Sequence, residues 1–260
     1  MSLLFSQQKF PMLVASISDS NPQDVICTIR NAILDGADGF MLHLEKMKQE
    51  HLNEEDLRKI IDHTCDKPIY TMNYRLKDSA DNDQQLIDAQ LTAIKAGATM
   101  IDMMGDMFDR SPLELTRNPK AIEQQKQIIA QVHEMGAEVL MSSHTYVYMT
   151  TEEVLAHATE LENRGADFVK IAMSVNSQEE MVESLKTTAV VSKALGVPFL
   201  HICMGPHGKL HRAIGPLFGS CFALCVQSYT SAGHKDKVLL RAEKCVLDNI
   251  DSGLNRSAYR

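Results

Sequence analysis

The chain has 260 residues, of which 44% are hydrophobic and 23% are charged, and its formal net charge is −8. This composition is typical of a globular protein with a sizeable core and excludes a disordered or collagen-like chain. The acidic balance and the scattered Lys and Arg residues argue against a nucleic-acid or anionic-membrane surface. We therefore expect a small molecule as the partner.

The ends and the cysteines indicate the compartment. The first ten residues, MSLLFSQQKF, lack a basic start followed by a long apolar core, and no stretch approaches eighteen consecutive apolar residues. The six cysteines are spread along the chain without a C-x-x-C pair, which argues against a disulfide framework. We expect a cytoplasmic protein without a membrane segment.

Short apolar runs alternate with longer segments of helical period, and each pair takes about 30 residues. Eight strands are predicted, at residues 12–18, 39–45, 68–74, 99–105, 138–144, 167–174, 198–205 and 221–228. Helices are expected between them. The first begins at the Ser20-Asn21-Pro22 cap region, another near residue 54, and the last covers roughly residues 235–250.

Eight βα units in unbroken order predict an α/β protein of the (β/α)8 TIM barrel class, as a single domain over residues 1–260. The chain has no G-x-G-x-x-G or P-loop pattern, which argues against an open nucleotide-binding sheet. Three helix-to-strand joints, in DGADGF, KAGATM and NRGADF, have Gly just after the helix, where a left-handed cap is expected.

The carboxyl ends of the strands are the place to look for chemistry, because catalytic groups of such barrels lie there. Lys170 interrupts the apolar strand FVKIAM, and its charge would cost several kcal/mol to bury unpaired. Burial lowers the pKa of a lysine and yields a free amine that can form a Schiff base with a ketone. The alternative is a lysine that pairs with a carboxylate or reaches water at the strand end.

Two further residues fit this chemistry. His144 closes the neighbouring strand, and an imidazole can remove and return protons at neutral pH. Arg212, in MGPHGKLHR, is expected at the top of the barrel, where a guanidinium can bind a carboxylate through two parallel hydrogen bonds. Their structural alternatives are a hydrogen-bonded histidine at a strand end and a solvated surface arginine.

The remaining histidines and acids raise the question of a metal. No H-E-x-x-H or similar ligand spacing is present, so we expect neither a metal nor an organic cofactor. The residues considered are His43, His201, His207, His211, His234, Glu45 and Asp102.

Together these residues resemble the type I 3-dehydroquinate dehydratases, the Schiff-base enzymes of the shikimate pathway of aromatic amino acid biosynthesis. The likeness spans nearly the whole chain and is specific in SSHTY at 142–146, in VKIAM at 169–173, and in MGPHGKLHR followed by FGS at 218–220. The resemblance implies that Lys170 forms the imine, that His144 is the general acid/base and that Arg212 binds the substrate carboxylate. It also implies a homodimer.

Departures from the family pattern cluster on the side that binds the substrate's hydroxyls. The E-x-R of strand two is replaced by His43 and Glu45, and the arginine that ends strand three is replaced by Asn73, unless Arg75 takes its place. The acid that supports the catalytic histidine has no clear match, and Asp78 is the nearest candidate.

The last loops differ as well. The S-x-x-G-Q pattern becomes Ser231-Ala232-Gly233-His234, and the serine before the strand-seven arginine becomes His211. The residues expected to bind the substrate are Arg212, His43, Glu45, Asn73, Ser231 and His234.

The resemblance implies a lyase that eliminates water from a cyclic or polyhydroxylated keto acid through a lysine imine. A site built for specific hydrogen bonds discriminates strongly when partners are exchanged, so we expect a substrate altered from 3-dehydroquinate. The alternatives are a class I aldolase that uses the same imine, a noncatalytic carboxylate-binding barrel, and a metal-dependent sugar isomerase or epimerase.

Overall fold

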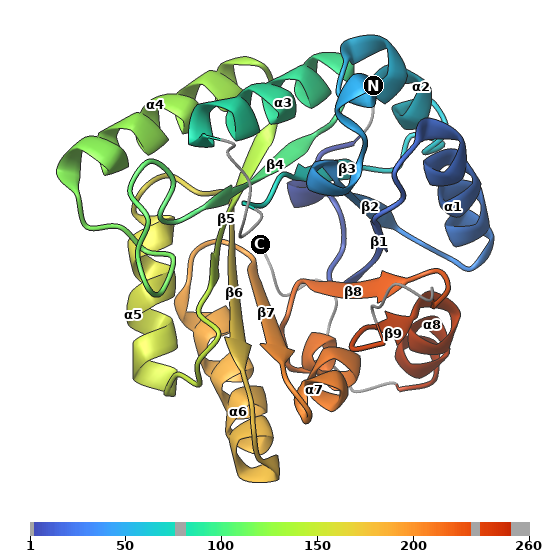
Figure 1. Cartoon of the computed structure of the whole chain (residues 1–260). Helices are drawn as coiled ribbons and strands as arrows, with labels where there is room; N and C mark the ends of the chain where they lie inside the picture. The colour runs from blue at the N-terminus through green and yellow to red at the C-terminus, as the bar shows by residue number, and fades with distance from the viewer. Residues whose placement is uncertain (1–2, 76–81, 230–234, 251–260) are drawn as a thin grey trace.

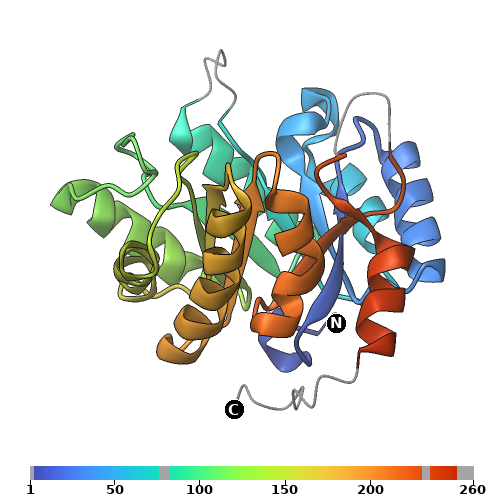
Figure 2. The ribbon, with the colours of Figure 1, turned by 90° about the horizontal axis from the view of Figure 1, so that it is seen from below.

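The computed structural model describes residues 3–75, 82–229 and 235–250. A curved sheet of parallel strands lies at the centre, and helices cover its outer side (Figures 1 and 2). The strands are β1 Met12–Ile17, β2 Gly39–His43, β3 Ile69–Met72, β4 Met100–Met104, β5 Glu138–His144, β6 Phe168–Ser174, β7 Phe199–Met204, β8 Phe222–Val226 and β9 Val238–Leu239. The helices are α1 Pro22–Leu34, α2 Glu54–Ile61, α3 Asp83–Ala96, α4 Pro119–Glu134, α5 Thr151–Glu162, α6 Gln178–Ala194, α7 Gly208–Ile214 and α8 Leu240–Asn249.

The eight strands predicted from the sequence are confirmed, with ends that differ by no more than two residues. Helix α1 begins at Pro22 as expected, and the Asn21 side chain accepts a hydrogen bond from the Asp24 amide at 3.1 Å. The glycines of the three helix-to-strand joints, at positions 36, 97 and 165, all have positive φ. The helix cap and the helix-ending glycines predicted from the sequence are therefore confirmed.

The end of the chain differs from the prediction. The expected helix over 235–250 begins only at Leu240, because Val238 and Leu239 form the short strand β9. This strand pairs in parallel with Cys225 and Val226 of β8. Residues expected to form the first turn of the helix are therefore part of the sheet. Lys237, which directly precedes β9, lies at the edge of that sheet.

The strands follow the order β7-β6-β5-β4-β3-β2-β1-β8-β9. Strands consecutive in sequence are therefore paired in the sheet, except that β8 pairs with β1 and not with β7. The Cys221 amide, just before β8, donates to the Phe199 carbonyl of β7 at 2.8 Å. The His201 amide of β7 donates to the Ser220 hydroxyl at 3.2 Å. These two bonds link β7 to the residues that directly precede β8. None of the helices in the described ranges has both the length and the apolar character needed to cross a bilayer.

The concave side of the sheet is filled by apolar side chains near the amino ends of the strands. Aromatic rings dominate this plug, and Phe168 and Phe222 stack with their centroids 5.5 Å apart. Its buried members include Phe5, Phe10, Met12, Val14, Met41, Tyr70, Met100, Leu140, Phe168, Leu200 and Phe222. The plug closes one end of the interior, so polar groups on the same side of the strands must lie toward the carboxyl ends.

Glu243 of α8 is a buried carboxyl group. Within the described ranges neither of its oxygens has a hydrogen-bond partner, and burial raises its pKa to about 7. The folded protein therefore binds more protons than the unfolded chain between about pH 4.5 and about pH 7. It follows that the free energy of unfolding decreases as the pH rises through this range.

Replacement of Glu243 by glutamine removes this titration. We expect the wild type to lose stability relative to Glu243→Gln by up to about 3 kcal/mol between about pH 5 and about pH 8, since each unit of pKa shift is worth about 1.4 kcal/mol. Urea unfolding of both proteins across this pH range measures the difference. Parallel stability curves for the two proteins would contradict the assignment.

Candidate functional site

Five strands place a polar side chain in the interior just above the apolar plug. Each lies two residues beyond a plug residue of its own strand, so alternation brings it to the same concave side. These residues are Ser16, His43, Asp102, Ser142 and Lys170, and all five are buried. We call this set the polar layer.

Lys170 and Asp102 form the ion pair of the polar layer. The Lys170 Nζ atom lies 2.9 Å from Asp102 Oδ2, and the two side chains are 3% and 1% exposed. The Ser142 hydroxyl donates to the other carboxylate oxygen at 2.5 Å, and Nζ also contacts the Met72 sulfur at 3.6 Å. Lys170 is therefore a buried amine whose charge Asp102 compensates. This is the carboxylate pairing that the sequence analysis gave as the structural alternative for Lys170.

His144 is held by a carboxylate that the sequence did not reveal. Glu114, in the segment between β4 and α4, accepts hydrogen bonds from His144 Nδ1 at 2.9 Å and from the His144 amide at 2.8 Å. The Tyr74 hydroxyl donates to its other oxygen. Burial acts to raise the pKa of Glu114, but these hydrogen bonds outweigh burial and lower it. Asp78, the acid expected in this role, lies outside the described residues.

Glu114 reaches His144 because its segment packs directly on the end of β4. The carbonyl of Gly105 accepts from the Thr116 amide at 3.1 Å and from the Arg164 guanidinium at 2.6 Å. A Cβ atom on Gly105 would lie 2.6 Å from the Glu114 carbonyl oxygen and 2.7 Å from a methyl group of Leu161. Only glycine permits this approach.

Glu114 itself has a φ of +48°. This left-handed conformation costs a residue with a side chain about 1 to 3 kcal/mol. The three hydrogen bonds of its carboxylate compensate the strain, so the conformation depends on the contact with His144. No local pattern in SPLELT marks such a residue, and sequence reasoning missed it for that reason.

A second chain of hydrogen bonds crosses the polar layer. Lys237 Nζ donates to Ser16 Oγ at 2.7 Å, Ser16 Oγ lies 3.0 Å from His43 Nε2, and His43 Nδ1 lies 2.8 Å from Glu45. Burial lowers the pKa of His43, so the ring is neutral and carries one proton. Burial acts to raise the pKa of Glu45, but the hydrogen bond from His43 outweighs burial and the net pKa is lowered. The Glu45 carboxylate is therefore ionised. The donors then run in one direction, from Lys237 to Glu45.

Arg212 of α7 is buried rather than solvated. Its Nε donates to the Cys203 carbonyl at 3.0 Å, and its guanidinium lies 3.1 Å from Asp236, with the side chain 10% exposed. Burial lowers its pKa, and Asp236 opposes that effect. The surface alternative for Arg212 is therefore wrong.

Other expected residues do not join these groups. The Asn73 amide donates to the Leu86 carbonyl of α3 at 3.1 Å, because Met72 faces Lys170 and the next residue must face the helices. Arg75 is paired with Asp83 and Asp106 at 2.6 Å, so it does not replace the missing arginine. Two further residues expected to bind the substrate, Ser231 and His234, lie outside the described residues.

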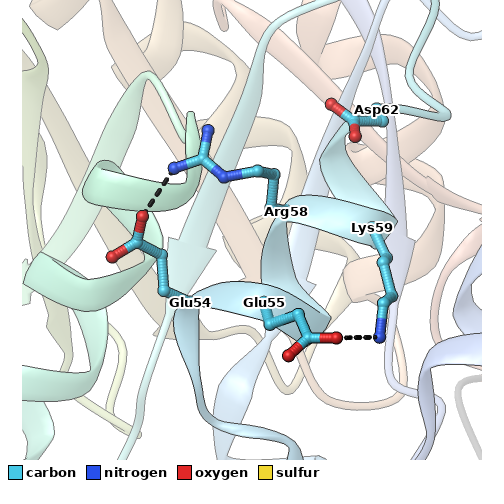
Figure 3. Close-up of a pocket in the computed structure, with 5 residues that line it drawn as sticks. All are labelled: Glu54, Glu55, Arg58, Lys59 and Asp62. Atoms are coloured by element: carbon cyan, nitrogen blue, oxygen red, sulfur yellow. Dashed lines mark hydrogen bonds and ion pairs between the residues drawn. The ribbon is translucent and has the colours of Figure 1, made fainter.

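A depression on the outer face of α2 has the features of an ordinary helix surface. Figure 3 shows its lining of charged side chains, in which Arg58 pairs with Glu54 at 2.6 Å and Lys59 with Glu55 at 2.8 Å. Pairs four residues apart are typical of a solvated helix surface. Its five lining residues are Glu54, Glu55, Arg58, Lys59 and Asp62. Across residues 3–75, 82–229 and 235–250, no three His, Cys, Asp or Glu side chains form a cluster that could hold a metal ion.

The buried pair predicts a stability effect that is separate from any activity. Lys170→Met leaves Asp102 without its cation and should lower the free energy of unfolding by about 3 to 5 kcal/mol. Adding Asp102→Asn removes the stranded charge and should restore most of this loss. Chemical denaturation measures both variants. As a control, Lys59→Met removes the two surface ion pairs that Lys59 makes with Glu55 and Asp56, and should change stability by no more than about 1 kcal/mol. Equal stability of the single and double variants at the buried pair would refute the pairing.

Comparison with known proteins places this geometry in a family. A model of type I 3-dehydroquinase matches residues 16–233. The 3-dehydroquinate dehydratase of Lactiplantibacillus plantarum is 30% identical over 135 residues, which cover 52% of each chain. That of Alkaliphilus oremlandii is 31% identical over 127 residues, which cover 48% of this chain and 49% of the relative. The chain thus spans about half the length of the curated relatives it matches.

Solved structures extend the likeness in fold to nearly the whole chain. The 3-dehydroquinate dehydratase of Geobacillus kaustophilus superposes with a TM-score of 0.79 and 16% identity over 98% of both chains. The type I enzyme of Clostridium difficile, solved with covalently modified comenic acid, has a TM-score of 0.77 and 17% identity over 93% of this chain and 92% of that one. With the family model covering most of its length, the chain belongs to the type I 3-dehydroquinase family.

Proposed function

We propose that this protein is a Schiff-base hydro-lyase that removes water from a cyclic or polyhydroxylated keto acid, as in the family reaction. The supporting observation is that a buried amine and a carboxylate-held imidazole lie on adjacent strands. Lys170 lies on β6 beside Ser142 of β5, and His144 lies two residues further along β5, opposite Ala172. Both side chains lie on the concave side of the sheet, within reach of one small substrate.

In the proposed reaction, the Lys170 amine attacks the substrate ketone, and loss of water gives a protonated imine. The imine acidifies the neighbouring C–H bond, and His144 takes that proton to leave an enamine. The enamine expels the β-hydroxyl as His144 returns a proton to the departing oxygen, and hydrolysis releases Lys170 and an unsaturated ketone. The net change is the loss of one water molecule, which requires neither a metal nor an organic cofactor.

Glu114 is the positioning residue of this proposal. Its ionised carboxylate accepts a hydrogen bond from the Nδ1–H group of His144. The other ring nitrogen, Nε2, is then the unprotonated one that takes the substrate proton. Asp102 holds the Lys170 amine at a fixed place in the polar layer. Each reacting group therefore has its own buried carboxylate, which limits the movement of both.

The binding groups of this proposal lie within the polar layer and around it. Arg212 binds the substrate carboxylate, and His43 and Glu45 form the altered hydroxyl side. The family resemblance supports Ser231 and His234 as further contacts. Asn73 is left out of the set, because its amide is engaged by α3.

The proposal also covers the closure of the barrel, its single domain, its assembly and its compartment. The bond from the Cys221 amide to the Phe199 carbonyl supports an eight-stranded barrel closed between β7 and β8, in a single domain. The resemblance to the family supports a homodimer in the cytoplasm.

The imine is tested by borohydride reduction in the presence of 3-dehydroquinate and other hydroxylated keto acids. We expect an intact-mass increase in the wild type and its loss in Lys170→Ala, with peptide mapping that assigns the adduct to Lys170 and not to the second buried lysine, Lys237. His144→Ala should still form the adduct but slow turnover by about 100-fold or more. Adducts on another lysine in both proteins would refute the assignment, and two- or three-carbon products would indicate an aldolase.

Selectivity gives a second test. Because the hydroxyl side carries His43 and Glu45, 3-dehydroquinate should be turned over with a kcat/KM below about 10⁴ M⁻¹s⁻¹. Arg212→Ala should weaken binding of the preferred keto acid by about 2 to 5 kcal/mol, because it breaks a buried charged hydrogen-bond pair. Steady-state kinetics on keto acids with altered ring hydroxyls measures both effects. A kcat/KM for 3-dehydroquinate at or above that value would show that the exchanged residues are tolerated variants.

A further inference from the structure

Lys237 is a second buried lysine of the site, and it lies outside every motif that the sequence suggested. It directly precedes β9, whose pairing with β8 holds the backbone at the edge of the sheet. The side chain is 8% exposed and extends to β1, where Nζ donates to Ser16 Oγ at 2.7 Å. Lys237 therefore enters the polar layer from the residues before β9, whereas Lys170 belongs to β6.

The two buried lysines differ in their partners. Lys170 has a carboxylate at 2.9 Å, whereas among the described residues Lys237 Nζ donates only to the neutral hydroxyl of Ser16. The adjacent acid, Asp236, is half-exposed and pairs with Arg212 instead. An ammonium group has three donors, so two remain for a ligand. A buried ammonium without a carboxylate is costly, and an anion bound beside it would offset that cost.

The charged groups around Lys237 come from several elements. Burial and the cations Arg212 and Lys170 lower its pKa to about 8, while Asp236 and Glu45 act in the opposite direction. Glu45 is already bound by His43, and Asp236 by Arg212. Neither carboxylate is therefore hydrogen-bonded to Lys237, whose ammonium lies close enough to Arg212 for the two charges to repel each other.

The hydrogen bonds of the Ser16 hydroxyl group hold Lys237 in place. Its hydroxyl proton is directed to His43 Nε2, because the other ring nitrogen donates to Glu45. The oxygen of Ser16 is then left to accept from Lys237. This order of donors fixes the ammonium at the border between the hydroxyl side and Arg212.

We propose that Lys237 is a specificity-determining residue that, together with Arg212, binds the anionic carboxylate of the substrate from two sides. The site then accepts a hydroxylated ring acid as its carboxylate and rejects the neutral ester. This inference deepens the proposed function, on which its choice of substrate class rests.

The test uses quinate and methyl quinate. Neither carries a ketone, so neither can form an imine and binding is measured apart from the chemistry of Lys170. By calorimetry, Lys237→Met should weaken quinate binding by about 10-fold or more, while the affinity for methyl quinate changes by less than about 2-fold. Lys237→Arg keeps the charge and should keep the preference for the acid.

The pH dependence supplies a readout that a structural role would not change. Quinate binding to the wild type should weaken as the pH rises through about 8, because Lys237 then loses its charge, and Lys237→Met should lack this dependence. Equal loss of affinity for acid and ester in Lys237→Met, or no binding of quinate by the wild type, would overturn the inference. If borohydride trapping fails while the preference for the acid still depends on Lys237, the imine mechanism is wrong and the anion site stands.

Discussion

The burial of charge inside the curved sheet is the constraint on which the rest of the structure depends. An ammonium group on the concave side of β6 is tolerable only because Asp102 of β4 lies 2.9 Å away, across the intervening strand β5. Ser142 of that strand completes the carboxylate's hydrogen bonds. The aromatic plug fills the interior of the curved sheet on the amino-terminal side of these groups.

Tyr74 joins the two halves of the site. Its hydroxyl donates to Glu114, which holds His144, and its amide donates to Glu45 at 3.4 Å, which accepts from His43. Tyr74, two positions beyond the end of β3, thus connects the carboxylate that holds His144 with the carboxylate that accepts from His43. A shift of this residue would disturb both carboxylates, so the geometry of the His144 imidazole is coupled to that of His43 and Glu45.

The fold could be predicted from the sequence because it depends on local signals. Apolar runs, caps and glycines mark each strand and helix, and the same period places Lys170 and His144 on the concave side. The Glu114 partner of His144 could not be predicted, since the two residues are 30 positions apart and the contact depends on how one loop folds. Lys237 was missed because its surroundings read as the start of a helix, whereas pairing with β8 makes them a strand. The contact of the Asn73 side chain with α3 could not be predicted, since it depends on Met72 and not Asn73 facing Lys170.

The close packing at Gly105 has a consequence for how natural variation in this protein is interpreted. The residue has no side chain and cannot touch a substrate, yet any larger residue there would displace the backbone of Glu114. Such a variant would retain every side chain of the site and still misalign the imidazole. In the proposed reaction, its kinetic defect would resemble the loss of the His144 side chain, although the cause is steric. Comparison of side chains alone would therefore classify a damaged protein as intact.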